Sequence, residues 1–157
     1  MTDIETLLAI AEIRNLKARY FRACDEKDAV LLGEVVARDV ELDYRGATTD
    51  PATGTNPIGD TTGEVRHGRE AAIAMMTAGP AGLVTVHHCA EPEIEIIDAD
   101  HARGIWPMVD RLRFPPGSSF REMTGYGHYH ETYLREDGRW RIATLRLSRL
   151  RLDFVPA

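Results

Sequence analysis

The sequence has 157 residues, of which 43% are hydrophobic and 28% charged, and its formal net charge is −6. This composition is typical of one globular domain, spanning residues 1–157, and the acidic balance excludes a nucleic-acid partner because no basic patch dominates. Two cysteines, Cys24 and Cys89, exclude a disulfide scaffold and predict a cytoplasmic protein, and the acidic N-terminus lacks the apolar run of a secretory signal or a membrane span.

The N-terminal half of the chain predicts mainly helices. Hydrophobic residues recur at helical spacing, and Thr2 or Asp3 can cap the start of the first helix. We expect helices over about 3–26, 28–37 and 69–78, with strands over 40–44 and around Val65. The segment 46–63 between them is rich in Thr, Gly, Pro and Asp. So long a loop in a small domain is usually functional or mobile.

From Gly82 onward the pattern changes to extended strands separated by turn signals. We expect four strands, over about 83–97, 102–114, 120–135 and 139–153. Helices followed by an antiparallel meander predict an α+β fold with the helices on one sheet face. A strongly curved sheet of this kind would enclose a cone-shaped cavity against the helices. Its open face would carry apolar patches, so we expect a homo-oligomer, either dimer or trimer.

One carboxylate falls where packing alone would not place it. In the strand over 102–114, Asp110 shares its parity with Trp106, Met108 and other apolar residues, whereas Arg111 and Arg113 take the opposite parity. Burying an ionised carboxylate among apolar groups costs about several kcal/mol unless it is paired or protonated. The strand therefore predicts either a working acid or a buried ion pair.

Three local runs resemble one known family. They are Lys17 to Asp25 (KARYFRACD), the Val86-His87-His88 run followed by Pro92 to Ile96 (PEIEI), and Gly138 to Ile142 (GRWRI). Together with the order of elements, they are similar to the SnoaL-like branch of the nuclear-transport-factor-2-like superfamily. That resemblance implies a cystatin-like α+β barrel, in which a cone-shaped, curved antiparallel sheet wraps around the N-terminal helices.

Within that branch the chain is most similar to dehydratases such as bile acid 7α-dehydratase, which act on carbonyl-activated polycyclic substrates. The resemblance implies five catalytic positions, namely Tyr20, Asp25, His87, Asp110 and Arg149. Scytalone dehydratase is a more distant likeness. It shares the Asp25-x-Lys27-Asp28 run, the run 42–45 and the His87 position, but Cys24 replaces its tyrosine. The longer loop 46–63 implies a different substrate.

The implied chemistry is elimination of water β to a carbonyl. It needs a base for the acidic C–H, a donor for the enolate oxygen and an acid for the leaving hydroxyl. His87 is the best base because its ordinary pKa of about 6.5 suits proton transfer near neutrality. Asp25 could fix its tautomer and Tyr20 could donate a phenol, while Asp110 could be the acid or the partner of Arg149.

We therefore expect a cofactor-independent dehydratase for a small hydrophobic ring substrate, such as a steroid or polyketide. A ketosteroid-type isomerase or polyketide cyclase would need almost the same groups. A non-catalytic ligand-binding or assembly module, like the β subunits of ring-hydroxylating dioxygenases, is the alternative from another class, and it predicts a blocked cavity. Fold analogy alone does not separate these functions.

Each candidate also has a plain structural interpretation. Tyr20 could be a core aromatic, and Asp25 could simply end the first helix. Arg149 would lie on the surface unless a bulge near Arg146-Leu147 turns it inward. We expect four further side chains to line the substrate pocket, namely Tyr44, Trp106, Met108 and His128. His128 and His130 share one strand face, at the pocket rim or on the outer face of the sheet, and no spacing signature predicts a metal.

Overall fold

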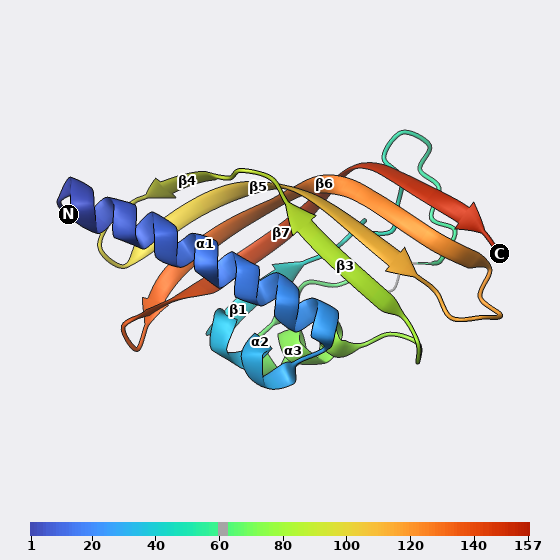
Figure 1. The fold of residues 1–157 in the computed structure, drawn as a ribbon, viewed down its shortest axis with the longest axis horizontal. Coiled ribbons are helices and arrows are strands. Elements are labelled where there is room, and N and C mark those ends of the chain that lie inside the picture. The colour runs from blue at the N-terminus through green and yellow to red at the C-terminus, as the bar shows by residue number, and fades with distance from the viewer. Residues whose placement is uncertain (60–62) are drawn as a thin grey trace.

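A computed structural model describes residues 1–59 and 63–157 of the chain (Figure 1). The described residues form three helices, α1 (Asp3–Glu26), α2 (Ala29–Val35) and α3 (Arg69–Thr77). Seven strands follow or separate them, namely β1 (Val36–Asp43), β2 (Arg66–His67), β3 (Val84–Cys89), β4 (Glu93–Ile96), β5 (His101–Arg113), β6 (Phe120–Glu136) and β7 (Arg139–Pro156). The α+β prediction is confirmed: the helices lie together on one side of a single sheet.

Helix α1 has the boundaries that its sequence predicted. The Thr2 hydroxyl accepts from the Glu5 amide, and the Glu5 carboxylate accepts from the Thr2 amide, which satisfies two donors at the helix start. The helix ends at Glu26, and the capping residue Lys27 adopts the left-handed conformation with φ of 57°. The helix crosses in front of the sheet (Figure 1), and its buried residues include Ile13 and Leu16.

The sheet is mixed and largely antiparallel, in the order β2-β1-β7-β6-β5-β3, with β4 also pairing with β5. Strands β5, β6 and β7 form the predicted meander. The expectation of a wholly antiparallel sheet is wrong at β1, which pairs with β7 in parallel. A parallel neighbour is possible because α3 and the long meander separate β1 from β7 in the sequence.

The strand expected over 83–97 is interrupted and forms two strands. Cys89 pairs with Met108 and Glu93 pairs with Ile105, so three residues of one strand face two of the other. The interruption contains Pro92, and the facing segment contains Pro107. Because neither proline has an N–H to donate, regular pairing cannot continue through this point.

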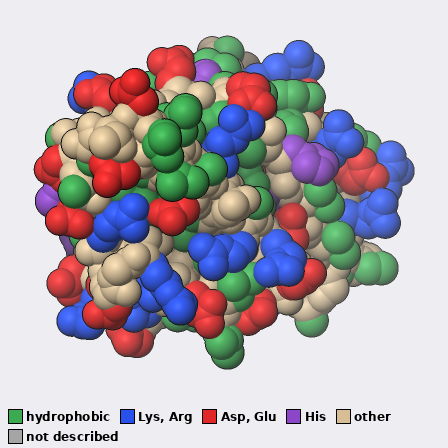
Figure 2. Space-filling view, turned by 60° about the vertical axis from the view of Figure 1, so that its left-hand side comes forward, with side chains coloured by type: hydrophobic (Ala, Val, Ile, Leu, Met, Phe, Trp, Pro, Cys, Tyr) green, Lys and Arg blue, Asp and Glu red, His purple; other side chains and the backbone are tan. Residues whose placement is uncertain are grey.

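The two sheet faces differ in burial, and the face toward the helices is the core. Along β5, Trp106, Met108 and Asp110 are buried on that face, as the parity predicted, whereas Arg111 and Arg113 lie on the other. None of the described helices is long and apolar enough to span a membrane. On the side of the molecule that Figure 2 shows, acidic and basic side chains are interspersed with smaller hydrophobic patches.

Candidate active site

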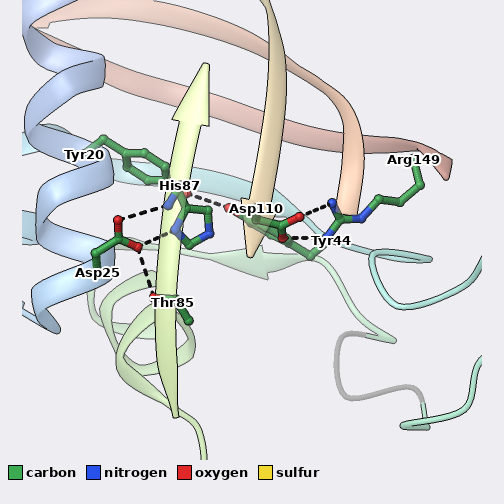
Figure 3. Close-up of polar contacts among 7 residues, drawn as sticks. All are labelled: Tyr20, Asp25, Tyr44, Thr85, His87, Asp110 and Arg149. Atoms are coloured by element: carbon green, nitrogen blue, oxygen red, sulfur yellow. Dashed lines mark hydrogen bonds and ion pairs between the residues drawn. The ribbon is translucent and has the colours of Figure 1, made fainter. Parts of the chain in front are cut away.

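An aspartate and a histidine meet where the last turn of α1 approaches β3 (Figure 3). His87 Nδ1 lies 2.6 Å from Asp25 Oδ1, and the His87 backbone amide donates to Asp25 Oδ2 at 3.0 Å. The Thr85 hydroxyl donates to Asp25 Oδ1 at 3.0 Å. The Asp25 carboxylate is therefore held by three groups of one strand, and in turn it fixes the orientation of the imidazole.

The ring of His87 is held on its flat side as well. Phe21, one helical turn before Asp25, stacks on it with 5.9 Å between ring centres and 7° between planes. The side chains of His87 and Asp25 remain 15% and 24% exposed. No described residue bonds to His87 Nε2, which leaves this nitrogen for a molecule from solvent.

The environment of Asp25 favours its ionised form. Burial raises the pKa of this carboxyl, but the hydrogen bonds from His87 and Thr85 outweigh burial and leave the pKa below its ordinary value of 3.8. An ionised Asp25 beside Nδ1 favours the tautomer that carries its proton on Nδ1. Nε2 then presents a lone pair and can act as a base.

Stability should depend on this carboxylate in a definite pH range. The pKa of Asp25 is lower in the folded state than in the unfolded state. The contribution of its carboxylate to the free energy of unfolding is therefore fully present above the unfolded pKa, and it is lost as the pH falls through the folded pKa. We expect Asp25→Asn to lower the free energy of unfolding by about 1–3 kcal/mol near pH 7. This difference should narrow below about pH 4, as measured by urea unfolding of both proteins. A difference that stays constant down to about pH 2 would contradict it.

The buried-pair interpretation of Asp110 is the one that the structure shows. Arg149 donates to both Asp110 oxygens, at 2.7 and 2.8 Å, and its Nε donates to the carbonyl of Ala47 at 2.7 Å. The Arg149 and Asp110 side chains are 5% and 7% exposed. Burial opposes the charge on Arg149, but the hydrogen bonds and the charge of Asp110, with smaller contributions from neighbouring tyrosines, together outweigh burial and raise the pKa of the guanidinium.

A bulge in β7 does turn Arg149 inward, but it lies before the expected place near Arg146-Leu147. Tyr133 pairs with Ile142 and Thr132 pairs with Thr144, so Ala143 is an extra residue, and the inner face passes from Ile142 to Leu145, Leu147 and Arg149. A second irregularity follows Arg149: Gly127 pairs with Arg149 and Tyr126 pairs with Arg151, which leaves Leu150 as the extra residue with an exposed side chain.

Gly125 makes room for this ion pair, and sequence reasoning missed it. Arg149 lies on β7 and Asp110 on β5, so the guanidinium must cross β6. It does so at Gly125, which carries no side chain, whereas Gly127 makes room for the backbone of Ser148 and Arg149. A Cβ added at Gly125 would collide with Asp110 Oδ1 and Arg149 Nη1. The signal was the Gly-x-Gly run inside a long strand, where glycine indicates close approach by another group.

Two tyrosines meet deeper in the same region. The hydroxyls of Tyr20 and Tyr44 lie 2.6 Å apart, and Tyr20 is almost fully buried while Tyr44 is partly buried. Burial raises the pKa of both phenols well above 10, so both hydroxyls are protonated and can donate hydrogen bonds at neutral pH.

The five predicted catalytic residues share the helix side of the sheet. His87 and Asp110 are directly opposite each other on β3 and β5, and Tyr20 and Asp25 lie on successive turns of α1. Figure 3 shows the Asp25–His87 pair between α1 and β3, and the Asp110–Arg149 pair beside β5. The structure thus brings four of these side chains together as two bonded pairs, while Tyr20 is bonded to Tyr44.

The four predicted pocket residues are divided between the two faces. Tyr44, Trp106 and Met108 are on the helix side, where Trp106 Nε1 donates to the Tyr133 hydroxyl at 2.6 Å. His128 is not with them, so its expected place in the pocket is corrected. It lies on the outer face beside His130, because strand parity sends it away from its neighbour Tyr129. No cluster of metal-binding side chains is found within residues 1–59 and 63–157.

Aromatic side chains occupy part of the space between the helices and the sheet. Tyr20, Phe21 and Tyr129 pack there with ring centres 5.8–6.3 Å apart. The described residues also border a cavity of about 780 Å³ on the outer face of the sheet, lined by residues of β1, β4, β5, β6 and β7. The cavity expected between helices and sheet stays a prediction.

The first residues of the loop after β1 border the candidate active site. Ala47 is buried and bonded to Arg149, and the Asp50 carboxylate accepts from the Leu152 amide at 3.0 Å. The start of the expected functional loop 46–63 is therefore fastened to β7. Its residues 60–62 lie outside the described residues.

Comparisons with known proteins give a consistent result. A family profile described as a SnoaL-like domain matches residues 5–146. Among solved structures, a hexachlorocyclohexane dehydrochlorinase (LinA, type 2) is 19% identical with a TM-score of 0.75, covering 99% of this chain and 95% of that one. No curated protein matches the chain.

Two further structures are similar. A provisionally named scytalone dehydratase from Novosphingobium aromaticivorans is 16% identical with a TM-score of 0.77, over 99% of this chain and 93% of that chain. A LinA-type3 dehydrochlorinase from Novosphingobium barchaimii is 20% identical with a TM-score of 0.73, over 99% and 94%. At these identities the likeness shows a shared fold.

Proposed function

The chain belongs to the SnoaL-like domain family, and we propose that it is a cofactor-independent lyase that removes water from a hydrophobic, carbonyl-bearing ring compound. The proposal rests on the Asp25–His87 pair: Nδ1 is bonded to a carboxylate, and the His87 side chain is 15% exposed. Supporting it, proteins of the same fold include a dehydrochlorinase and a provisionally named dehydratase, and both names describe eliminations.

In the proposed reaction, His87 Nε2 removes a proton from the carbon beside the substrate carbonyl. The electron pair of that C–H bond moves toward the carbonyl and forms an enolate, whose oxygen accepts a hydrogen bond from the Tyr20–Tyr44 hydroxyl pair. The enolate then expels the β-hydroxyl, which takes the proton from His87 and leaves as water. The imidazole returns to its neutral form, and the ring compound gains a carbon–carbon double bond.

Asp25 acts in this scheme through His87. Its carboxylate holds the imidazole in one tautomer and stabilises the imidazolium that forms during proton transfer. The Asp110–Arg149 pair has both guanidinium ends and Nε occupied by protein oxygens. Its proposed role is therefore electrostatic: a fixed dipole beside the enolate that needs no rearrangement during the reaction.

One observation favours a second candidate, the non-catalytic ligand-binding or assembly module. The cavity that the described residues border lies on the outer face of the sheet, away from the Asp25–His87 pair, and Tyr20 and Tyr129 pack against each other in the interior. The module would bind a ligand or partner there without changing it. The two candidates predict different products, so one assay separates them.

The assay is incubation with a panel of β-hydroxyketone steroids and aromatic polyketides in deuterium oxide. A lyase gives a product that has lost one water and absorbs as a conjugated enone. An isomerase or cyclase gives a product without loss of water. Binding without chemical change, detected by ligand NMR, would contradict the lyase and support the module.

A further inference from the structure

A second charged pair lies in the interior, and the proposed mechanism does not use it. The Lys17 ammonium on α1 pairs with Glu131 on β6, and the two side chains are 1% and 0% exposed. The Tyr133 hydroxyl donates to the other Glu131 oxygen and accepts from Trp106 Nε1. The Lys17 nitrogen also lies over the Tyr129 ring, 3.9 Å from its centre. Every polar group of this cluster is therefore tied to a partner.

Stability alone does not explain why this pair is present. Burial lowers the pKa of Lys17, against the attraction of Glu131, so the charge is held at a cost. Uncharged residues of similar volume often replace a buried ion pair with no loss of stability. The pair adds a directional constraint on how α1 packs against the sheet. Apolar contacts tolerate sliding and rotation of a helix, whereas a hydrogen-bonded ion pair fixes the positions of two atoms relative to each other.

The same helix carries the carboxylate of the candidate active site. Lys17 and Asp25 are eight residues apart on α1, which is about 12 Å along the helix axis. The hydrogen bonds between Asp25 and His87 tolerate displacements of only about 0.5 Å. A small rotation or slide of α1 on its apolar stripe would therefore break them.

Phe21 links the two places directly. The centre of its ring lies 4.7 Å from the Lys17 nitrogen, and the same ring stacks on the His87 ring. One phenyl ring thus contacts both the buried ammonium and the proposed base. Any shift of α1 that separates Lys17 from Glu131 would also displace the surface on which the imidazole rests.

We propose that the Lys17–Glu131 pair is a positioning device. It fixes the rotation of α1 about its axis and its position along that axis, so that the Asp25 carboxylate meets the Nδ1 and amide groups of His87. Neither side chain touches the substrate. The catalytic consequence rests on the proposed lyase function, whereas the geometric consequence can be measured without any substrate.

The test is a double variant, Lys17→Met with Glu131→Gln. It removes both charges, keeps similar volumes and leaves an acceptor for the Tyr133 hydroxyl. The His87 amide, which donates to Asp25, should exchange with deuterium at least about tenfold faster, while amides of β6 keep their wild-type rates. With an active substrate, kcat should fall at least about tenfold and KM should change by less than about threefold.

The same helix offers a matched control. Arg14 pairs with Glu91 at 2.9 Å, but these side chains are 50% and 80% exposed. Arg14→Met with Glu91→Gln removes the same charges from a contact of α1 with the segment after β3. Both the His87 amide exchange and kcat should stay at wild-type values. A control as impaired as the interior variant would overturn the proposal, since any loss of charge on α1 would then suffice.

If the His87 amide of the double variant exchanges at the wild-type rate, the positioning proposal is also overturned, and the Lys17–Glu131 pair is a purely structural feature. If the double variant does not fold, Tyr133→Phe decides, because it removes only the hydroxyl that orients Glu131. We then expect at least about threefold faster exchange at His87, and an unchanged rate contradicts positioning. A wild-type protein that binds ketones without eliminating water refutes the lyase and leaves the exchange result valid.

Discussion

Replacing His87 by alanine is expected to lower kcat of the proposed elimination by about 10²–10⁴-fold, because the substrate loses its base. Asp25→Asn should cost about 10²-fold or more, since the amide can no longer hold the imidazole in the required tautomer. The measurement is steady-state turnover of both variants, with circular dichroism to show that each has folded.

His88→Ala is the matched control for this experiment. His88 is the next residue of β3, but its side chain is exposed on the other face of the sheet. An imidazole lost there should leave kcat within about twofold of the wild type. Equal turnover of His87→Ala and the wild-type protein would end the proposed mechanism and leave the fold unaffected.

Gly125→Ala is expected to separate the Asp110–Arg149 pair, because the new methyl group would occupy the path of the guanidinium across β6. A buried carboxylate would then lose its partner, so we expect the free energy of unfolding to fall by about 3 kcal/mol or more. Turnover should fall together with stability. Urea unfolding and kcat at a temperature where the variant is folded are the two measurements.

Gly104→Ala provides the comparison on the same sheet face. A Cβ at Gly104 would meet the Glu93 carbonyl at 3.2 Å and the Trp106 and Tyr133 rings at 3.4 Å, which small shifts can relieve. We expect it to cost roughly 1 kcal/mol. If Gly125→Ala lowered the free energy of unfolding no more than Gly104→Ala does, the Arg149 guanidinium would not need the absence of a side chain at Gly125 to cross β6.

The candidate site was only partly predictable from the sequence. The Asp25 and His87 positions followed from the resemblance, and strand parity placed Asp110 on the buried face. Parity could not say that Arg149 would be its partner, since these residues lie on strands separated by β6. His128 was assigned to the pocket, although its strand position sends it to the opposite face.

Lys17 shows the same limit in the core. Its position on the stripe of Leu16 and Tyr20 was visible, but a lysine at the edge of such a stripe usually extends to solvent. Only the fold brings Glu131 opposite it, 114 residues later in the chain. The homo-oligomer and the ring-shaped substrate stay predictions.

Helix caps, periodicity and prolines act over a few neighbouring residues, so the elements and their faces could be predicted from the sequence. These predictions included the bounds of α1, the order of the first helices before the long meander, and the inward face of β5. The parallel pairing of β1 with β7, the choice of the ion pair over the free acid for Asp110, and the partner of Lys17 depended on the tertiary structure. These contacts join residues far apart in the chain, so their energies depend on which surfaces the whole fold brings together.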